Sequence, residues 1–411
     1  MHAVITGGGI IGLFSALYLR RAGWEVTIID KGDMLSGCSY GNAGMITPSH
    51  FVPLAAPGVI KQAFKWMFSA SSPFHIRPRL NSNMLSWGIN FIKSASEEHV
   101  ERSAAPLRDL LLMGRSLYED LENEQGFSFS LRKKGTIMYY KSGKVGAEEI
   151  KLAEKAKELG LETEVYDRRK LREMEPGLNV NALGGVHYKC DAHLNPADLM
   201  KQLLLKLKDE VTWVRNTAGK FERKNGKIAG ITAGGELISG DLFILSGGSW
   251  SAGLAASLGI NIPLVPGKGY SVTLERPRAE LVHPAILCEA RVALTPMNGR
   301  LRFGGTMEIG SPAGRINMKR VKSITDAVNA CFPALKAEMP AKSTVWAGLR
   351  PVSADGLPYI GSTQRYDNLI IATGHSMLGL GAAPATGKLV AEIAEGKPTS
   401  LALEAFRPDR F

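Results

Sequence analysis

The chain has 411 residues, of which 45% are hydrophobic and 22% are charged, and its formal net charge is +11. This length can build two or three lobes around a sizeable core, and the composition is that of a globular protein without a membrane-spanning helix, because no apolar run approaches roughly 20 residues. The four cysteines lie far apart and form no C-x-x-C pair, which argues against a metal site or a disulfide framework and favours a reducing compartment.

The first thirty residues contain the most informative pattern. His2–Thr6 is a short apolar run that predicts a buried parallel strand, a glycine-rich turn follows at once, and residues 13–22 continue with helical spacing. Residues 24–29 predict a second strand. Because the first strand begins at residue 2, we expect no cleaved signal peptide.

The glycine spacing in this turn is Gly7-x-Gly9-x-x-Gly12, and Asp30 follows the second strand. Gly7 permits a tight turn, Gly9 lets the backbone approach a pyrophosphate, and Gly12 lets helix and strand pack closely. The helix N-terminus offers N–H groups and a positive dipole end to phosphates, and Asp30 can accept a hydrogen bond from a ribose hydroxyl. The pattern predicts an adenine dinucleotide, NAD or FAD; its alternative is a glycine-rich turn in an ordinary βαβ unit.

The segment from residue 34 to residue 96 contains no Asp or Glu, and its part 59–93 combines lysines and arginines with large apolar side chains. Two interpretations stay open for this basic apolar segment. It is suited to contact with an anionic membrane surface, or it is an insertion of a substrate domain that packs its aromatic side chains inward. Nucleic-acid binding is disfavoured, because no binding motif accompanies the charge.

Other helices and strands are predicted along the rest of the chain. The Asn195-Pro196 pair predicts the start of a helix, and Asn225-Gly226 predicts a β-hairpin. The other expected helices are 59–68, 85–93, 97–125 with or without a break at Pro106, 147–159, 324–331 and 379–395. The other expected strands are 135–140, 211–214, 237–245, several within 264–303, and 368–372.

A second glycine cluster lies near the C-terminus, where residues 346–361 precede a strand and residues 374–381 follow it. A glycine-rich turn from strand to helix supplies N–H groups and a helix dipole that can hold the negative edge of a flavin. Such a turn stabilises charge as it develops on the reduced ring. A nicotinamide enzyme does not need this second cluster, so the pattern favours FAD.

On these residues the sequence resembles the D-amino acid oxidase-like flavoprotein superfamily, and most closely its D-amino acid dehydrogenase branch. Glycine oxidase and the sarcosine oxidases are more distant by this resemblance, which covers nearly the full chain. The matching segments are 7–12, 42–45, 55–58, 65–68, 268–271, 304–309, 348–351 and 374–375.

The resemblance implies a mixed α/β fold, with a Rossmann-type FAD-binding domain and a discontinuous, antiparallel β-rich substrate domain. The expected FAD-binding domain comprises residues 1–50, 146–260 and 345–411. The expected substrate domain comprises residues 51–145 and 261–344.

The resemblance also implies that FAD is bound without a covalent bond, because Cys38 and His50 match no known attachment pattern. Backbone near Gly219 is expected at the adenine, and Leu378 and Gly379 at the pyrimidine edge of the flavin. The full set of expected cofactor-binding residues is Gly7, Gly9, Ile10, Ile11, Gly12, Asp30, Lys31, Ser39, Asn42, Ala43, Gly44, Met45, Gly219, Gly247, Gly248, Gly374, Leu378 and Gly379.

For the substrate, the resemblance implies that Arg350 grips the carboxylate, a task for which a planar guanidinium is suited. Its alternative is an arginine that bridges strands between the domains. Tyr270 is expected as a pocket wall or hydroxyl donor, or else as a core aromatic. His375 is expected to line the flavin or to cap the turn. Met377 stands where some relatives carry Arg, and Arg291 where dehydrogenases tend to show Lys, which suggests an altered pocket.

The implied function is an FAD-dependent dehydrogenase that oxidises a D-amino acid, with D-proline or hydroxy-D-proline as candidates, to the imino acid. Hydride would pass from Cα to flavin N5, and electrons would pass to a quinone or another acceptor other than oxygen. The alternatives are an oxygen-using glycine or sarcosine-type amine oxidase, and a flavin-binding subunit of a larger complex. The expected location is cytoplasmic, and contact of residues 59–93 with the inner face of the membrane is one of the two interpretations left open for this segment.

Overall fold

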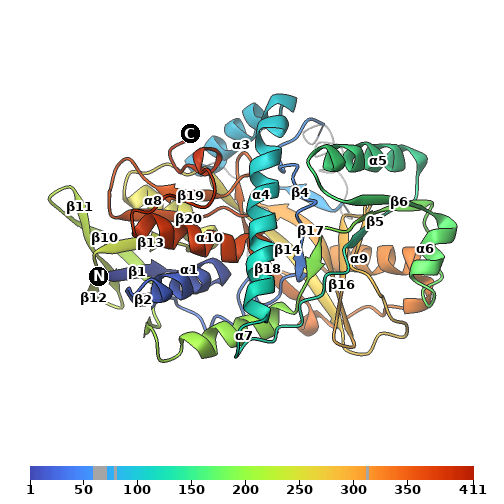
Figure 1. Ribbon diagram of the computed structural model, residues 1–411, viewed down its shortest axis with the longest axis horizontal. Coiled ribbons are helices and arrows are strands. Elements are labelled where there is room, and N and C mark those ends of the chain that lie inside the picture. The colour runs from blue at the N-terminus through green and yellow to red at the C-terminus, as the bar shows by residue number, and fades with distance from the viewer. Residues whose placement is uncertain (59–71, 78–80, 312–313) are drawn as a thin grey trace.

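The computed structural model describes residues 1–58, 72–77, 81–311 and 314–411. It contains two large sheets, which lie on the left and on the right in Figure 1 with a long helix between them. The helix expected at 59–68 and the matching segment 65–68 lie outside the described residues.

The first sheet has six strands in the order β19-β20-β13-β1-β2-β9. All neighbours in it are parallel except β19, which is antiparallel to β20. The strands are β1 (His2–Thr6), β2 (Glu25–Ile29), β9 (Thr212–Val214), β13 (Leu242–Leu245), β19 (Tyr359–Ser362) and β20 (Leu369–Thr373). The apolar runs expected at 2–6, 24–29 and 368–372 thus form buried parallel strands, as predicted.

The second sheet is mostly antiparallel and follows the order β18-β14-β17-β16-β15-β5-β7-β6, with β4 beside β17. Its strands are β4 (Phe74–Ile76), β5 (Thr136–Tyr140), β6 (Thr163–Asp167), β7 (Gly184–Tyr188), β14 (Leu264–Leu274), β15 (Ala285–Leu287), β16 (Val292–Met297), β17 (Arg300–Ile309) and β18 (Trp346–Ser353). The predicted combination of a Rossmann-type sheet with an antiparallel β-rich part is therefore confirmed.

Two smaller sheets complete the strands. A three-stranded sheet joins β10 (Ala218–Lys224), β11 (Lys227–Ala233) and β12 (Glu236–Ser239), and β3 (Met45–Ile46) pairs with β8 (Ala192–His193). Asn225 and Gly226 connect β10 to β11 with φ of 53° and 75°, the backbone that a two-residue hairpin turn needs. The hairpin predicted there is confirmed.

The sheet membership of three strands differs from the expected domain division. β6 and β7 lie within 146–260, and β18 within 345–411, yet all three belong to the second sheet. β7 pairs with β5 and β6 along five residues on each side. Strand pairing thus assigns residues 163–188 and 346–353 to the β-rich part, because the chain crosses between the sheets more often than expected.

The described helices pack on both sheets and between them. They are α1 (Ile10–Arg21), α3 (Ser82–Ser94), α4 (Glu97–Glu122), α5 (Gly143–Glu158), α6 (Arg168–Met174), α7 (Pro196–Leu207), α8 (Ser251–Ser257), α9 (Met318–Cys331) and α10 (Gly379–Ala394). Asn195 caps α7 through a hydrogen bond from the Ala197 N–H, with Pro196 in the first turn, as the sequence predicted.

The long helix expected at 97–125 is confirmed, and of the two possibilities left open at Pro106 the structure has the unbroken helix, because α4 runs through this residue. Proline removes one helical hydrogen bond, but the next turn buries Leu107, Leu110 and Leu111 almost completely. On the same helix, a Cβ placed on Gly114 would lie 2.0 Å from the Gly381 carbonyl oxygen of α10. This burial and close approach hold the two halves of α4 in one line.

Candidate active site

A cavity of about 1540 Å³ opens where the parallel strands of the first sheet end and extends to β14, β17 and β18 of the second sheet. Thr6, Ile29 and Leu245 are in register at the ends of β1, β2 and β13, and the residues that follow these strands line the cavity. The carboxyl edge of such a sheet is where ligands of doubly wound folds bind. Two glycine-rich turns from distant parts of the chain thus meet at one site.

The first turn is shaped as the glycine spacing predicts. Gly7 has φ of +102°, and a Cβ on Gly12 would lie 1.9 Å from the Gly7 carbonyl oxygen. α1 begins at Ile10 with Gly9 as its N-cap, without a side-chain cap from that residue and without an acidic residue in its first turn. The positive end of the helix dipole therefore faces the cavity uncompensated, which suits a phosphate.

Asp30 joins this turn to the end of β2. Its Oδ2 accepts a hydrogen bond from the Gly8 N–H at 2.7 Å, and its Oδ1 accepts one from the Gly32 N–H at 2.8 Å. The carboxylate therefore orders the glycine turn itself, a role the sequence did not predict. It also lines the cavity, so the expected contact with a ribose hydroxyl stays a prediction.

The loop of residues 39–45 crosses the cavity and is held from both sheets. Ser39 Oγ accepts a hydrogen bond from the Ile10 N–H at 3.0 Å. Asn42 Oδ1 accepts one from the Gly44 N–H at 2.8 Å. From β17, the buried Arg302 donates to the carbonyl oxygens of Tyr40 and Asn42 at 3.2 and 2.8 Å. Sequence reasoning missed Arg302, since an arginine within a strand gives no sign of the loop that it holds.

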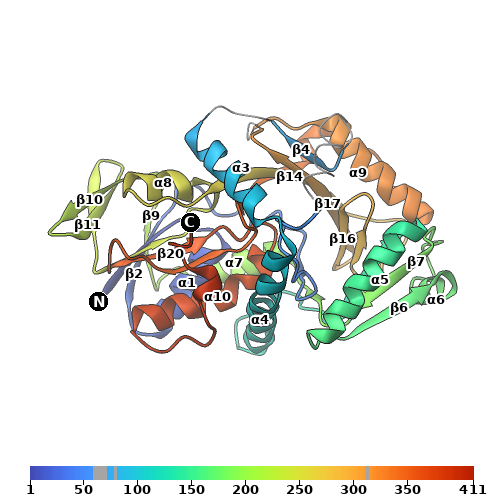
Figure 2. The same cartoon turned by 90° about the horizontal axis from the view of Figure 1, so that it is seen from above.

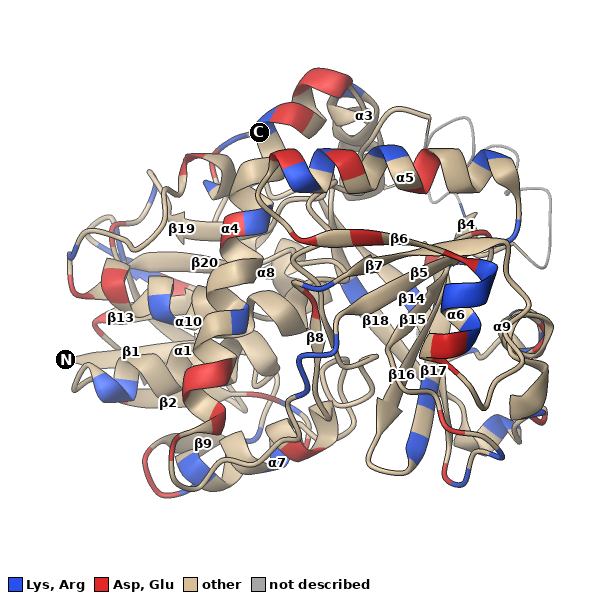
Figure 3. Cartoon of the chain, turned by 45° about the vertical axis from the view of Figure 1, so that its right-hand side comes forward, with Lys and Arg blue, Asp and Glu red and all other residues tan. Residues whose placement is uncertain are grey.

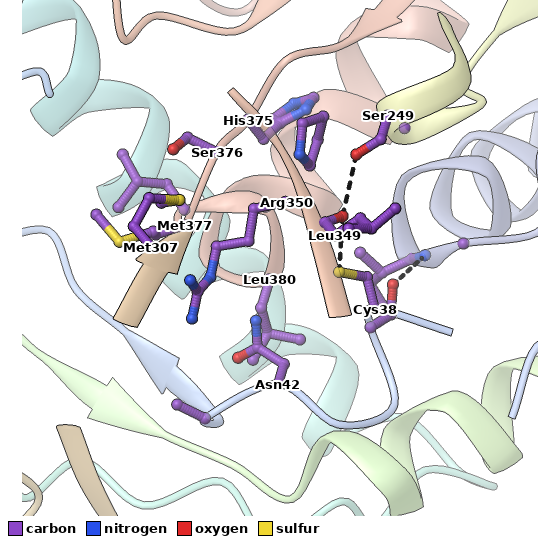
Figure 4. A pocket seen from close by; sticks show the side chains of 18 of the residues that line it. Cys38, Asn42, Ser249, Met307, Leu349, Arg350, His375, Ser376, Met377 and Leu380 are labelled. Carbon is purple, nitrogen blue, oxygen red and sulfur yellow. Dashed lines mark hydrogen bonds between the residues drawn. The ribbon is translucent and has the colours of Figure 1, made fainter. Parts of the chain in front are cut away.

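Of the two residues considered for covalent attachment, Cys38 is a poor nucleophile in this structure. Burial raises the pKa of the Cys38 thiol to about 11, and this thiol donates a hydrogen bond to the Leu349 carbonyl oxygen (Figure 4). Burial, with a smaller effect of Arg291, lowers the pKa of His50 to about 4. A protonated thiol is a poor nucleophile, which is consistent with the expected non-covalent FAD.

The second glycine-rich turn follows β20 and leads into α10. His375 is buried, and its Nε2 lies 3.0 Å from Thr386 Oγ1. Its Nδ1 and the Ser376 hydroxyl are buried without a hydrogen-bond partner within the described residues, although both residues line the cavity. Such groups favour a polar ligand beside this turn. The imidazole contact with α10 fits the expected capping role of His375 as well.

The buried imidazole of His375 makes stability depend on pH. Burial lowers its pKa to about 3, below the usual value near 6.5 in the unfolded chain. As the pH falls below 6.5, the unfolded state takes up a proton that the folded state does not, so stability is lost down to about pH 3. Between pH 7.5 and 5.5 we expect this group to cost about 1.4 kcal/mol. Urea unfolding at both pH values should show this loss in the wild-type protein, and a His375→Gln variant should lack that part of it.

Arg350 projects from β18 into the cavity (Figure 4). Its Nη1 donates a hydrogen bond to the Thr306 carbonyl oxygen at 2.7 Å, and burial lowers the pKa of its guanidinium. Within the described residues no carboxylate forms an ion pair with it. Thr306, which holds it, has φ of +70°, an uncommon backbone for a β-branched residue. A partly buried cation without an acidic partner favours an anionic ligand.

Tyr270 places its ring on the cavity wall, but its hydroxyl points into the buried second sheet. The hydroxyl donates to Glu308 Oε1 at 3.0 Å and accepts from the Asn317 N–H at 3.2 Å. Glu308 also pairs with Lys268 and Arg320. Because its hydroxyl is engaged, the structure favours the wall role of Tyr270 over the role of a donor to substrate.

Most of the expected site residues line the one cavity. The substrate candidates Arg350, Tyr270, Arg291, Met377 and His375 all do so. The expected cofactor residues that line it are Gly7, Gly9, Ile10, Ile11, Asp30, Lys31, Ser39, Asn42, Ala43, Met45, Gly247, Gly248, Leu378 and Gly379. Four of the expected residues do not line it: Gly12, Gly44, Gly219 and Gly374. Near Gly219, the residues that line the cavity are Thr217 and Ala218.

Comparisons with known proteins agree with this geometry. A family model described as FAD dependent oxidoreductase matches residues 2–393. The D-amino acid dehydrogenases of Methylobacterium nodulans and Methylobacterium radiotolerans are each 31% identical over 426 residues. These alignments cover all of this chain and 99% and 100% of the relatives.

Among solved structures, glycine oxidase from Geobacillus kaustophilus is similar with a TM-score of 0.78 and 24% identity. The alignment covers 100% of this chain and 98% of that one. At this identity the likeness concerns the fold alone.

Proposed function

The chain belongs to the FAD dependent oxidoreductase family, as its resemblance predicted, and from this premise we propose that it is a D-amino acid dehydrogenase. It oxidises the Cα–N bond of a D-amino acid to an imino acid, which water hydrolyses unless the imine is cyclic. The electrons pass to an acceptor other than oxygen. Names of full-length relatives at 31% identity support the reaction class.

The residues present fit FAD. Gly7 and Gly9 line the cavity without side chains, and Gly12 lets α1 lie close against this turn, since a Cβ on it would be 1.9 Å from the Gly7 carbonyl oxygen. The N-termini of α1 and α10 both face the cavity, and Ser376 has a buried hydroxyl without a partner in the described residues. FAD bound there supplies the two-electron acceptor for the substrate. Leu378 and Gly379 would hold its pyrimidine edge.

The observation that carries the proposal is Arg350. A partly buried guanidinium without an acidic partner in the described residues can pair with the substrate carboxylate through two charge-assisted hydrogen bonds. Its hydrogen bond to Thr306 fixes its position. A carboxylate held in this way fixes the orientation of the α-carbon and lowers the entropic cost of reaction.

Anaerobic reduction of the bound flavin tests the proposal. The purified chain is mixed with D-, L- and N-methyl amino acids, and with both D-prolines, and its flavin absorbance is followed. We expect D-amino acids to bleach it, and in air we expect dye or quinone reduction without an equal yield of hydrogen peroxide. Peroxide equal to turnover would select an amine oxidase instead. No bleaching by any amino acid would favour a flavin-binding subunit of a larger complex.

We also propose a surface that brings the protein to its electron acceptor, a quinone in the membrane. α3 buries Trp87 and Phe91 and exposes Leu85, Ile89 and Ile92 by 66%, 46% and 63%. It lies at the outer edge of the molecule in Figure 2. The segment around it, residues 34–96, contains no acidic residue. An exposed aliphatic face in a basic segment suits an anionic lipid surface. No helix of the described residues is long and apolar enough to cross a membrane.

Replacing the exposed face of α3 tests this surface. A variant with Leu85→Ser, Ile89→Ser and Ile92→Ser loses apolar area that lipid would bury, so we expect its binding to vesicles of anionic phospholipid to fall at least about tenfold in a sedimentation assay at low salt. Leu205→Ser on α7 is the control, because Leu205 is 72% exposed on another helix. Equal binding of the triple variant and the wild type would contradict the proposal.

A further inference from the structure

The cavity has an end on the side of the second sheet that the proposed chemistry leaves without a role. α5, which lies above β6 in Figure 3, forms one wall of this end with Leu152 and Glu149. Met138, Tyr188 and Ile286 from β5, β7 and β15 line the cavity next to α5 and share a hydrophobic cluster with its Ala153 and Ala156. Four charged residues also line the cavity here: Lys144, Glu148 and Arg291 are exposed, and Glu149 is buried. Sites of this kind select a ligand by its shape and a few hydrogen bonds.

Glu149 is the first of these polar groups. Its residue is only 5% exposed, and its Oε2 is buried without a hydrogen-bond partner within the described residues. Burial is the main cause that raises the pKa of this carboxyl, and a hydrogen bond with the Cys288 thiol acts against it, so it is Oε2 alone that is without a partner among the described residues. A buried oxygen without a partner is costly. An acceptor of this kind on a cavity wall indicates a ligand that donates a hydrogen bond.

Arg291 is the second polar group. It has φ of +53° in the turn between β15 and β16, and it lines the same cavity. Arg291 is exposed, and its charge acts on both Glu149 and His50. No carboxylate of the described chain pairs with it within 4.0 Å. Its N–H groups are therefore available as donors in the cavity that Glu149 also lines.

Resting on the proposed function, we infer that Glu149 and Arg291 form a subsite for the substrate side chain, and that this subsite takes a neutral group which both donates and accepts hydrogen bonds. A hydroxyl or a carboxamide has this chemistry. Its O–H or N–H donates to Glu149, and its oxygen accepts from Arg291. The apolar walls hold the carbon atoms that connect this group to the α-carbon.

The other classes of side chain fit less well. An ammonium group would meet the charge of Arg291, and a carboxylate would meet Glu149, so each gains one partner and is repelled by the other. An aliphatic side chain would leave the Glu149 oxygen buried and unpaired. Sites that hydrogen-bond a substrate group reject analogues without it strongly, because their own polar groups are then left unpaired.

Matched substrate pairs test the subsite and separate its two candidate ligands. We would measure kcat/KM with dye as acceptor for D-glutamine against D-methionine, and for 4-hydroxy-D-proline against D-proline. We expect at least about a tenfold preference for the polar member of one pair or both. The pair that shows it identifies carboxamide or hydroxyl as the recognised group. D-lysine and D-glutamate should both be poorer than the preferred substrate.

Two substitutions of Glu149 then test whether this residue causes the preference for the polar substrate. Glu149→Leu and Glu149→Gln should remove most of it, mainly through KM, while their flavin content stays that of the wild type. Glu154→Gln is the matched control, because Glu154 is an exposed glutamate of α5 that does not line the cavity. Equal kcat/KM within both pairs, or a preference that survives in both Glu149 variants, would overturn the subsite and leave the proposed function standing. No flavin reduction by any D-amino acid would overturn the proposed function and, with it, the subsite.

Discussion

The Arg350→Ala variant is expected to lose about two to three orders of magnitude in kcat/KM for its amino acid substrate. Truncating one partner of a buried charge pair costs about 2–5 kcal/mol, which corresponds to about 30-fold to several thousand-fold. Both KM and kcat should change, because the guanidinium both binds the carboxylate and fixes the α-carbon. Anaerobic flavin reduction followed by stopped flow would separate these two effects.

The stability of this variant should move in the opposite direction. Arg350 is a partly buried cation that donates to the Thr306 carbonyl and has no acidic partner in the described residues, so its removal relieves a desolvation cost. We expect the free energy of unfolding of Arg350→Ala to equal or exceed that of the wild type. Arg276→Ala, at an exposed arginine, should leave kcat/KM unchanged. Wild-type activity in Arg350→Ala would refute the assigned role.

The sequence predicted those parts of the fold that local chemistry determines. The Gly7–Gly12 spacing, the apolar run before it and the Asn225-Gly226 pair each allow few backbone conformations, and the structure contains the expected turn, strand and hairpin. The continuity of α4 through Pro106 could not be predicted in this way. It depends on burial of Leu107, Leu110 and Leu111 against elements distant in the sequence.

As with the fold, the sequence predicted only those site residues that belong to local motifs. Arg350 and the second glycine turn belong to dense motifs, and both lie in the cavity. Arg302 holds the loop at Asn42 from a strand 260 residues away, and Glu149 faces the cavity from a helix whose surface is otherwise charged. Neither residue stands in a motif. Their positions follow from how the second sheet is assembled, which a single sequence does not reveal.

The second large effect is expected on FAD binding, from a glycine that does not itself line the cavity. Gly12 lies where α1 crosses the end of β1, and a Cβ there would meet the Gly7 carbonyl oxygen at 1.9 Å and Ser246 Oγ at 3.0 Å. Backbone cannot yield as a flexible side chain can. An added methyl group must therefore push the helix away from the strand and move the N–H groups of its first turn.

We thus expect Gly12→Ala to be purified with at least about tenfold less FAD per chain, and with a free energy of unfolding lower by about 1–3 kcal/mol. Flavin absorbance relative to protein and urea unfolding of the FAD-free forms measure the two effects separately. Gly88→Ala is the matched control, since a Cβ on Gly88 in α3 meets nothing within 4 Å. It should keep full FAD and gain about 0.5–1 kcal/mol from helix propensity. Full FAD content in Gly12→Ala would show that the close packing of α1 on β1 does not position the cofactor.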